Sequence, residues 1–127
     1  MEFPNGLKYT KDHEWIDTAA APVTIGVTAY AVDQLGDIVH VELPKVGDSF
    51  EAGAAFGTIE STKTVSDLYM PVAGKVVEIN KAAVSNPQSL QEDPYKLGWL
   101  VKVEVKSKID ASTLLDAKAY QHFVAEA

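Results

Sequence analysis

Alternating apolar and polar residues recur in short runs along this sequence. The clearest run is WLVKVEVK at 99–106, where Trp99, Val101, Val103 and Val105 share one face of an extended chain and the opposite face is mostly polar. Alternation with a period of two residues is typical of a half-buried strand in an antiparallel sheet. The sequence therefore predicts a chain built mainly from antiparallel strands.

Other runs fit the same pattern and are separated by turn signals. In DIVHVEL (37–43), the alternation predicts Val39, Val41 and Leu43 on one face, with Ile38 among the residues on the other. VTIGV, GKVVEI and HEWI are further strand candidates, and PKVGD, EAGAA, MPVAG and NPQS are typical of turns. We predict one domain over residues 1–127, mainly β, with two antiparallel sheets in a sandwich or flattened barrel.

Two segments carry helix signals. TAYAVDQLG (28–36) has Thr28 as a possible N-cap and Gly36 as a stop, which encloses about two turns. The alanine-rich segment at 114–127 can be capped by Asp116 and has an apolar face with helical spacing, formed by Tyr120, Phe123 and Val124. The prediction is one short internal helix and one C-terminal helix.

The composition excludes several functions. The 127 residues carry 18 acidic side chains against 11 basic ones, all lysines, so the net charge is −7 and nucleic acid is a poor partner. Cysteine is absent, so any thiol chemistry needs sulfur from an attached group. No stretch is long enough to predict a membrane span, and the start of the chain lacks signal- or transit-peptide features. We expect a cytoplasmic protein, or one of the mitochondrial matrix if a presequence has been removed.

No catalytic pattern stands out in the sequence. His13, His40 and His122 are scattered without the spacing of a metal site, and no nucleotide-binding or nucleophile motif is present. The chain is therefore not expected to be an enzyme by itself.

One lysine occupies a conspicuous position. FGTIES (56–61) and VSDLYM (65–70) resemble the two arms of a hairpin, which places Lys63 at the tip, within STKT. An exposed lysine amine is a natural acceptor for an amide-linked prosthetic group. The local pattern alone leaves two interpretations open, and an ordinary solvated turn lysine is the more common of the two.

A resemblance to a known family favours the modified lysine. The chain resembles the lipoyl-carrying H protein of the glycine cleavage system almost from end to end, through KYTKDHEW, IGVTAYAVDQLGDIVHVELPKVGD, FGTIESTKTVSDLYMPVAGKVVEIN, NPQSLQEDPYKLGWLVKV and LLDAKAYQHF. The family's motif is Glu-Ser-Val-Lys followed by a small residue, and here it is Glu60-Ser61-Thr62-Lys63-Thr64. The threonines are a departure from that motif. They also argue against a biotin carrier, which usually has methionine on both sides of its lysine.

The resemblance implies both a fold and a function. The fold is the hammerhead-like sandwich of lipoyl and biotinyl carriers, with lipoate covalently attached to Lys63 at a hairpin turn. The implied role is to shuttle an aminomethyl group from glycine decarboxylase, a pyridoxal-phosphate enzyme, to an aminomethyltransferase, and electrons to dihydrolipoamide dehydrogenase. A lipoate-attaching enzyme is the fourth implied partner. The chain would be a non-catalytic, monomeric carrier.

The same resemblance implies roles for further residues. Glu14 and Asp67 match positions that hold the loaded arm in a cleft, although solvated acids on strands are the ordinary alternative. Glu60, Gly47 and Gly74, together with Asp67, match positions linked to modification of the lysine. We expect the two glycines to act through positive φ angles in turns.

Two alternatives to glycine cleavage stay open at this point. One is a lipoyl relay or a carrier for another pathway. The other is an unmodified interaction domain that has the same fold, in which case replacing Lys63 would leave function intact.

Overall fold

The computed structural model describes residues 2–19, 21–106, 108–109 and 111–126. The strands of this part of the chain are β1 (Lys8–Tyr9), β2 (Glu14–Asp17), β3 (Val23–Val27), β4 (Ile38–Glu42), β5 (Ser49–Phe50), β6 (Ala55–Ser61), β7 (Val65–Tyr69), β8 (Gly74–Ile79) and β9 (Val101–Val105). The helices are α1 (Ala29–Leu35), α2 (Lys81–Ser85), α3 (Ser89–Glu92) and α4 (Ala117–Ala125), with a 3₁₀ turn, η1, at Ala111–Thr113.

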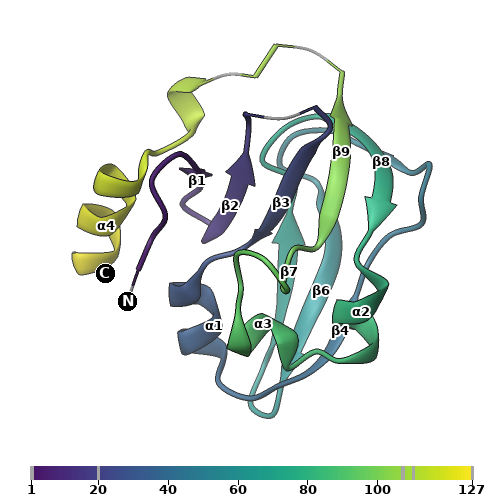
Figure 1. Ribbon diagram of the computed structural model, residues 1–127, viewed down its shortest axis with the longest axis vertical. Coiled ribbons are helices and arrows are strands. Elements are labelled where there is room, and N and C mark those ends of the chain that lie inside the picture. Colours follow the sequence, from purple (N-terminus) through teal and green to yellow (C-terminus); the bar gives the residue numbers. More distant parts are fainter. Residues whose placement is uncertain (1, 20, 107, 110, 127) are drawn as a thin grey trace.

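The strands form two antiparallel sheets that face one another (Figure 1). The larger sheet has the order β1-β2-β3-β9-β8-β5, and the smaller sheet has the order β4-β6-β7. Among the described residues both sheets are open at their edges, so the sandwich is confirmed and the flattened barrel is not. The order β3-β9 joins strands that are far apart in the sequence, and it places the run at 99–106 in the middle of the larger sheet.

The alternating pattern predicts one strand correctly and another incorrectly. In β9, Val101 and Val103 are fully buried, as expected. In β4, the pairing with β6 shifts between Ile38 and His40, which marks a bulge. A bulge exchanges the faces on either side of it. Ile38 is therefore 2% exposed and Val39 is 51% exposed, so the predicted placement of Val39 with Val41 was wrong.

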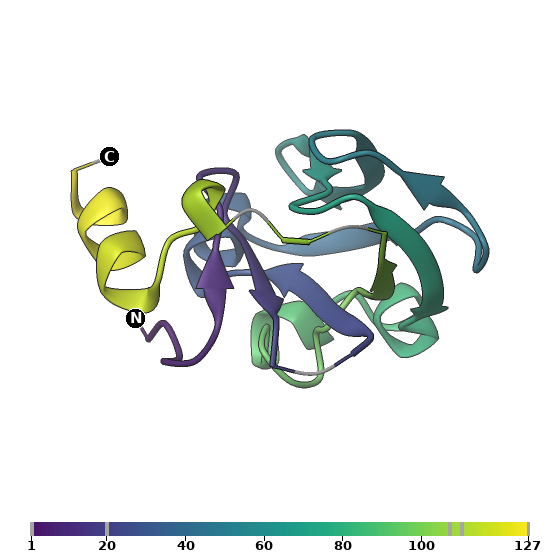
Figure 2. The same cartoon turned by 90° about the horizontal axis from the view of Figure 1, so that it is seen from above.

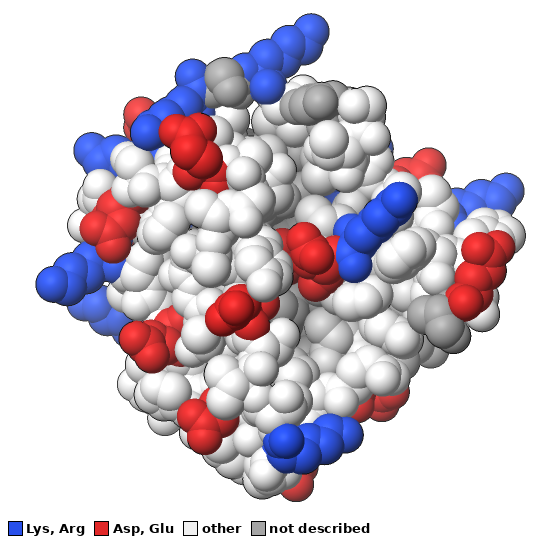
Figure 3. All heavy atoms as spheres, turned by 180° about the vertical axis from the view of Figure 1, so that it is seen from behind, with Lys and Arg blue, Asp and Glu red and all other residues white. Residues whose placement is uncertain are grey.

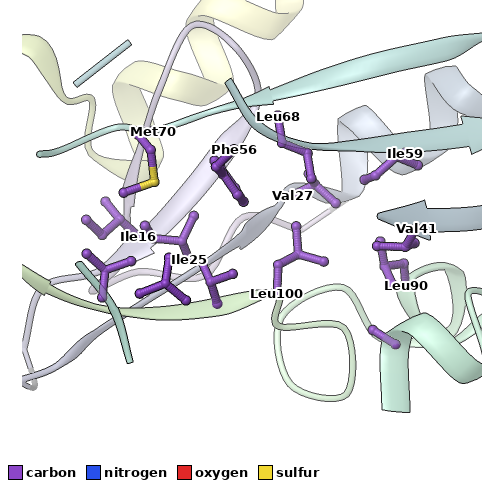
Figure 4. Close-up of a cluster of buried hydrophobic side chains, with 14 of the residues drawn as sticks. Ile16, Ile25, Val27, Val41, Phe56, Ile59, Leu68, Met70, Leu90 and Leu100 are labelled. Carbon is purple, nitrogen blue, oxygen red and sulfur yellow. The ribbon is translucent and has the colours of Figure 1, made fainter. Parts of the chain in front are cut away.

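The main core lies between the two sheets. In Figure 4, side chains of the larger sheet, such as Ile16 and Ile25, point toward those of the smaller sheet, such as Phe56 and Leu68. Leu100, from the segment before β9, is fully buried in the same core. Burial of side chains like these contributes about 1.5–3 kcal/mol each, which makes this core the dominant source of stability.

The predicted internal helix is confirmed, together with both of its ends. The Thr28 hydroxyl accepts a hydrogen bond from the N–H of Ala31, and Gly36 ends the helix with a φ of 80°. The turn predicted at NPQS (86–89) is present, and the structure adds two short helices, α2 and α3, one on each side of it. The Asn80 side chain caps α2 by accepting from the N–H of Ala83.

The C-terminal helix is also confirmed, and it packs beside the sandwich (Figure 2). Asp116 caps it by accepting from the N–H of Ala119 at 2.7 Å. Tyr120 is fully buried in an aromatic cluster with Tyr9 and Trp15, separate from the main core. Its hydroxyl oxygen lies 2.7 Å from Nδ1 of His13 and 2.8 Å from the Thr28 hydroxyl, so α4 is connected directly to the N-cap of α1.

No helix in the described part of the chain combines the length and the apolar character needed to cross a membrane.

Candidate functional site

The predicted hairpin is present, and Lys63 is exposed at its tip. Strands β6 and β7 pair up to Glu60 and Val65, and the chain turns between Ser61 and Thr64. The N–H of Ser61 donates to the carbonyl of Thr64 at 2.8 Å, and the Ser61 hydroxyl accepts from the N–H groups of Lys63 and Thr64. The backbone that carries Lys63 is therefore fixed, while its side chain is exposed.

Ser61 is the part of this turn that sequence reasoning missed. Its side chain is buried, although the residue lies two positions before an exposed lysine. A serine or threonine just before a turn often satisfies the turn's N–H groups in this way. That chemistry was available as a signal in the motif Glu60-Ser61-Thr62-Lys63-Thr64.

The hairpin tip packs against the C-terminal end of α1. The N–H of Thr62 donates to the carbonyl of Asp37 at 3.0 Å. A Cβ atom built on Gly36 would lie 3.5 Å from Cε of Lys63 and 3.8 Å from its Nζ. The end of the lysine side chain therefore lies over Gly36, and α1 forms the wall next to the amine.

A cleft of about 140 Å³ opens on one side of α1. It lies between β2, α1 and the hairpin β6–β7, and both Glu14 and Asp67 line it. The remaining lining residues are Asp12, His13, Val27, Ala31, Gln34, Leu35, Ile59, Ser66 and Leu68. Five of the eleven lining residues are apolar, namely Val27, Ala31, Leu35, Ile59 and Leu68, and their surface can shield a small group from water.

Glu14 is the unusual residue of this cleft. Its side chain is 2% exposed, so the alternative of a solvated acid is wrong for this position. One carboxyl oxygen, Oε2, accepts from the N–H of Tyr69 at 2.7 Å, whereas Oε1 has no hydrogen-bond partner among the described residues. Burial raises the pKa of Glu14 to about 8, and the charge of Asp12 acts in the same direction, whereas the hydrogen bond from Tyr69 and the nearby Thr10 hydroxyl oppose that rise. Glu14 is thus a buried acid that holds a proton near neutral pH.

Asp67 differs from Glu14 although it lines the same cleft. It is exposed on β7, and the hydroxyl of Tyr69 donates to its Oδ2 at 3.5 Å. Its carboxylate therefore lies in water at the edge of the cleft. The solvated interpretation and a role at the rim are both compatible with this position.

His13 also lines the cleft, and sequence reasoning treated it only as a scattered histidine. Its φ is 68°, a region that non-glycine residues rarely adopt. Two backbone hydrogen bonds hold His13 in this conformation. Its N–H donates to the carbonyl of Thr10, and its carbonyl accepts from the N–H of Thr28. Burial lowers the pKa of His13, with Asp12 acting in the opposite direction.

Of the two glycines implied by the resemblance, Gly74 is the first residue of β8 and Gly47 lies in a turn beside that strand. Gly47 has a φ of 101°, as expected for a turn, and its N–H donates to the carbonyl of Val76. The same expectation was wrong for Gly74, which is not among the glycines of positive φ. A Cβ on Gly74 would lie 2.3 Å from Cγ1 of Val103, so close packing between β8 and β9 requires glycine there.

Glu60 is exposed at the end of β6, opposite Val65 and next to the turn. It is placed where an enzyme approaching Lys63 could contact it. Neither Glu60 nor the two glycines line the cleft. In the described part of the chain, no group of three His, Asp or Glu side chains could hold a metal ion.

Comparisons with known proteins agree with this geometry. Residues 7–127 match the family model described as glycine cleavage H-protein. The chain is 49% identical over 124 residues to a glycine cleavage system H protein of Bacteroides thetaiotaomicron, covering 98% of both chains. It is 45% identical over 126 residues to the one of Anaeromyxobacter sp. (strain K), covering 99% of this chain and 98% of that relative.

A solved structure is similar over the same length. The crystal structure of a glycine cleavage system H protein from Mycobacterium marinum superposes with a TM-score of 0.88 at 44% identity. The match covers 97% of this chain and 99% of the other. The family supports a lipoyl-carrier role in glycine cleavage. From the exposed hairpin lysine, the adjoining cleft and these comparisons together, we conclude that this chain belongs to the glycine cleavage H-protein family.

Proposed function

We propose that this chain is the lipoylated carrier of glycine cleavage, with lipoate attached through an amide bond to Nζ of Lys63. It would carry the aminomethyl group from glycine decarboxylase to the aminomethyltransferase, and electrons to dihydrolipoamide dehydrogenase. The observation that carries this proposal is an exposed lysine on a fixed turn of the hairpin that lines a cleft, in which a buried carboxyl oxygen has no partner among the described residues. An ordinary solvated lysine needs neither the fixed turn nor the cleft.

The residues around Lys63 fit an attached lipoyl group. When bound, that group supplies the disulfide that accepts the aminomethyl unit and the reducing equivalents. Ser61 fixes the backbone of the turn, so an attaching enzyme meets Lys63 in one geometry. The apolar residues Leu35 and Leu68 exclude water from the cleft next to it.

Glu14 would recognise the positive charge of the carried amine. In the empty cleft its buried carboxyl keeps a proton, because an unpaired carboxylate is costly there. An entering ammonium group offers Oε1 the partner that it lacks, so Glu14 would release its proton and form an ion pair. The solvated Asp67 adds a second negative charge at the rim.

The partner enzymes would perform the chemistry and this chain would only deliver the group. Tethering a reactive group raises its effective concentration at each docked enzyme. The net charge of −7 favours partners with basic docking surfaces. Figure 3 shows acidic side chains across the middle of the face opposite to that of Figure 1, with most lysines around its edge.

The test is modification followed by transfer. The chain is expressed with lipoate and a lipoate-attaching enzyme, and its intact mass and peptides are then measured. We expect a lipoyl increment on the peptide with Lys63, its loss in Lys63→Arg, and no loss in Lys45→Arg, an exposed turn lysine elsewhere. No increment on folded protein would refute the carrier proposal and leave an unmodified interaction domain.

A transfer assay separates glycine cleavage from a lipoyl relay. The lipoylated chain is combined with glycine decarboxylase, the aminomethyltransferase, dihydrolipoamide dehydrogenase and tetrahydrofolate. We expect ammonia release that depends on glycine and on this chain. A lipoylated chain that supports no release would point to the relay or to another pathway.

A further inference from the structure

Helix α1 separates two hollows that lie on opposite sides of it. The cleft with Glu14 is lined by Ala31, Gln34 and Leu35, which share one face of the helix. A second hollow is lined by the face that begins at Ala29 and includes Val32 and Asp33, at the helical spacing of three and four residues. One short helix therefore serves as a wall for both hollows.

The second hollow is a groove of about 460 Å³ between α1 and the segment that contains α3. Its apolar surface comes from Ala29 and Val32 on α1 and from Pro94 on the other side. Asp33 and Asp37 are both exposed and line it as well, so its edge is acidic and hydrated. The groove is larger and more open than the cleft of about 140 Å³.

Lys63 lies at the mouth of this groove. Gly36, which the end of the lysine side chain covers, lines the groove and not the cleft. Figure 1 shows the tip of the β6–β7 hairpin at the same end of the molecule as α1 and α3. A group attached to Nζ of Lys63 therefore begins at the groove.

The groove also has a hydrogen-bond donor for an amide. Oε1 of Gln91 accepts from the backbone N–H of Ile38 at 2.9 Å, which orients the side-chain amide. Its NH₂ group is then the end available to a ligand. An amide formed on Nζ of Lys63 has a carbonyl oxygen, which can accept a hydrogen bond from this NH₂ group.

We propose that the groove formed by Ala29, Val32, Gly36, Gln91 and Pro94 is the resting site of the unloaded lipoyl arm. This rests on the proposed lipoylation of Lys63. The hydrocarbon chain and the ring would pack on Ala29, Val32 and Pro94, and the amide carbonyl would accept from Gln91. The arm is then held on one side of α1 when empty and on the other when it carries an amine.

Charge decides which side is favoured. A neutral arm brings no cation for Oε1 of Glu14, so it gains no ion pair by entering the cleft, and the apolar contacts and the amide donor of the groove decide where it rests. The groove has no buried carboxyl to satisfy, because Asp33 and Asp37 are exposed. An ammonium group in the groove meets only the solvated carboxyl groups of Asp33 and Asp37, where an ion pair contributes little. In the cleft it pairs with the buried carboxyl of Glu14. The cargo itself therefore selects between the two hollows.

The test is a nuclear Overhauser measurement on the oxidised lipoylated protein with ¹³C-labelled methyl groups. We expect contacts from the lipoyl protons to the methyl groups of Ala29 and Val32. Contacts confined to Ala31 and Leu35 in the cleft, or no contacts at all, would overturn the groove assignment. The intact mass is measured first, and absence of a lipoyl increment would refute the proposed function and this inference together. An increment without groove contacts refutes the inference alone.

Matched variants on the same helix sharpen the test. Ala29→Ile fills the groove and Ala31→Ile fills the cleft, and both put a β-branched residue at a half-buried position of α1. We expect Ala29→Ile to remove the contacts to Val32 and Ala31→Ile to keep them. Retention of these contacts in Ala29→Ile, or equal loss in both variants, would contradict the proposal.

Discussion

Replacing Glu14 by glutamine should change how stability depends on pH. Burial raises the pKa of Glu14 from its ordinary 4.5 to about 8 in the folded chain. Between these two values the folded state keeps the proton and the unfolded state has lost it. The free energy of unfolding therefore falls as pH rises through this window and levels off above about 8. Glutamine has no proton to lose, so its variant lacks this fall.

The size of the effect follows from the same two values. At about 1.4 kcal/mol for each pKa unit, the difference between 4.5 and about 8 corresponds to roughly 5 kcal/mol. At pH 4.5 the Glu14→Gln variant and the parent chain should be close in stability. At pH 9 the variant should be more stable by up to that amount, which is a rise in Tm on the order of 15 °C for a domain of this size.

The assay is thermal unfolding of the unmodified chain, followed by circular dichroism between pH 4.5 and pH 9. Asp67→Asn is the matched control, because Asp67 is exposed in the same cleft. His13, whose pKa is lowered by burial, destabilises parent and variants alike as pH falls, so its effect cancels in the difference. Parallel curves for the parent and Glu14→Gln would refute the reasoning and place the Glu14 carboxylate in contact with water.

Three substitutions test packing and hydrogen bonds elsewhere. Gly74→Ala places a Cβ too close to Val103, so it should lower the free energy of unfolding, measured in urea, by about 1–3 kcal/mol. An unchanged urea midpoint would show that β8 and β9 can move apart. Tyr120→Phe removes the hydroxyl shared by His13 and Thr28, with an expected loss of about 1–3 kcal/mol by thermal unfolding, and wild-type stability would mean that water replaces it. Asp116→Ala should cost about 1 kcal/mol of stability and reduce helical dichroism, whereas equal spectra would argue against the cap.

The elements with strong local signals could be predicted from the sequence. Thr28 and Gly36 mark the ends of α1, and alternation marks β9, because each signal depends only on neighbouring residues. The helices α2 and α3 were missed because they are only 5 and 4 residues long. Periodicity cannot identify a helix that short. Asn80, which caps α2, was the one available signal.

The position of the candidate site could be predicted from the sequence, but the environment of its side chains could be predicted only in part. Lys63 at a hairpin tip follows from the two strands that flank it, and these are local. The burial of Glu14 depends on α1 and on β7, which lies more than 50 residues away, so no local pattern reveals it. The reason for glycine at position 74 was also predicted wrongly, as a positive φ angle. The real reason is the close approach of Val103, which belongs to a different strand and so cannot be seen in the local sequence.

The separation of the interior into two clusters has a consequence for hydrogen exchange. The aromatic cluster beneath α4 is smaller than the core between the sheets, so α4 can open as a cooperative unit of its own while the sheets stay folded. Each opening withdraws the Tyr120 hydroxyl from Thr28, the N-cap of α1. Opening of α4 would therefore lower the protection against hydrogen exchange of the amides at the start of α1. The two residues that couple these helices, Thr28 and Tyr120, are 92 positions apart in the chain. The C-terminal helix thus contributes to the rigidity of α1, the helix beside which the side chain of Lys63 lies.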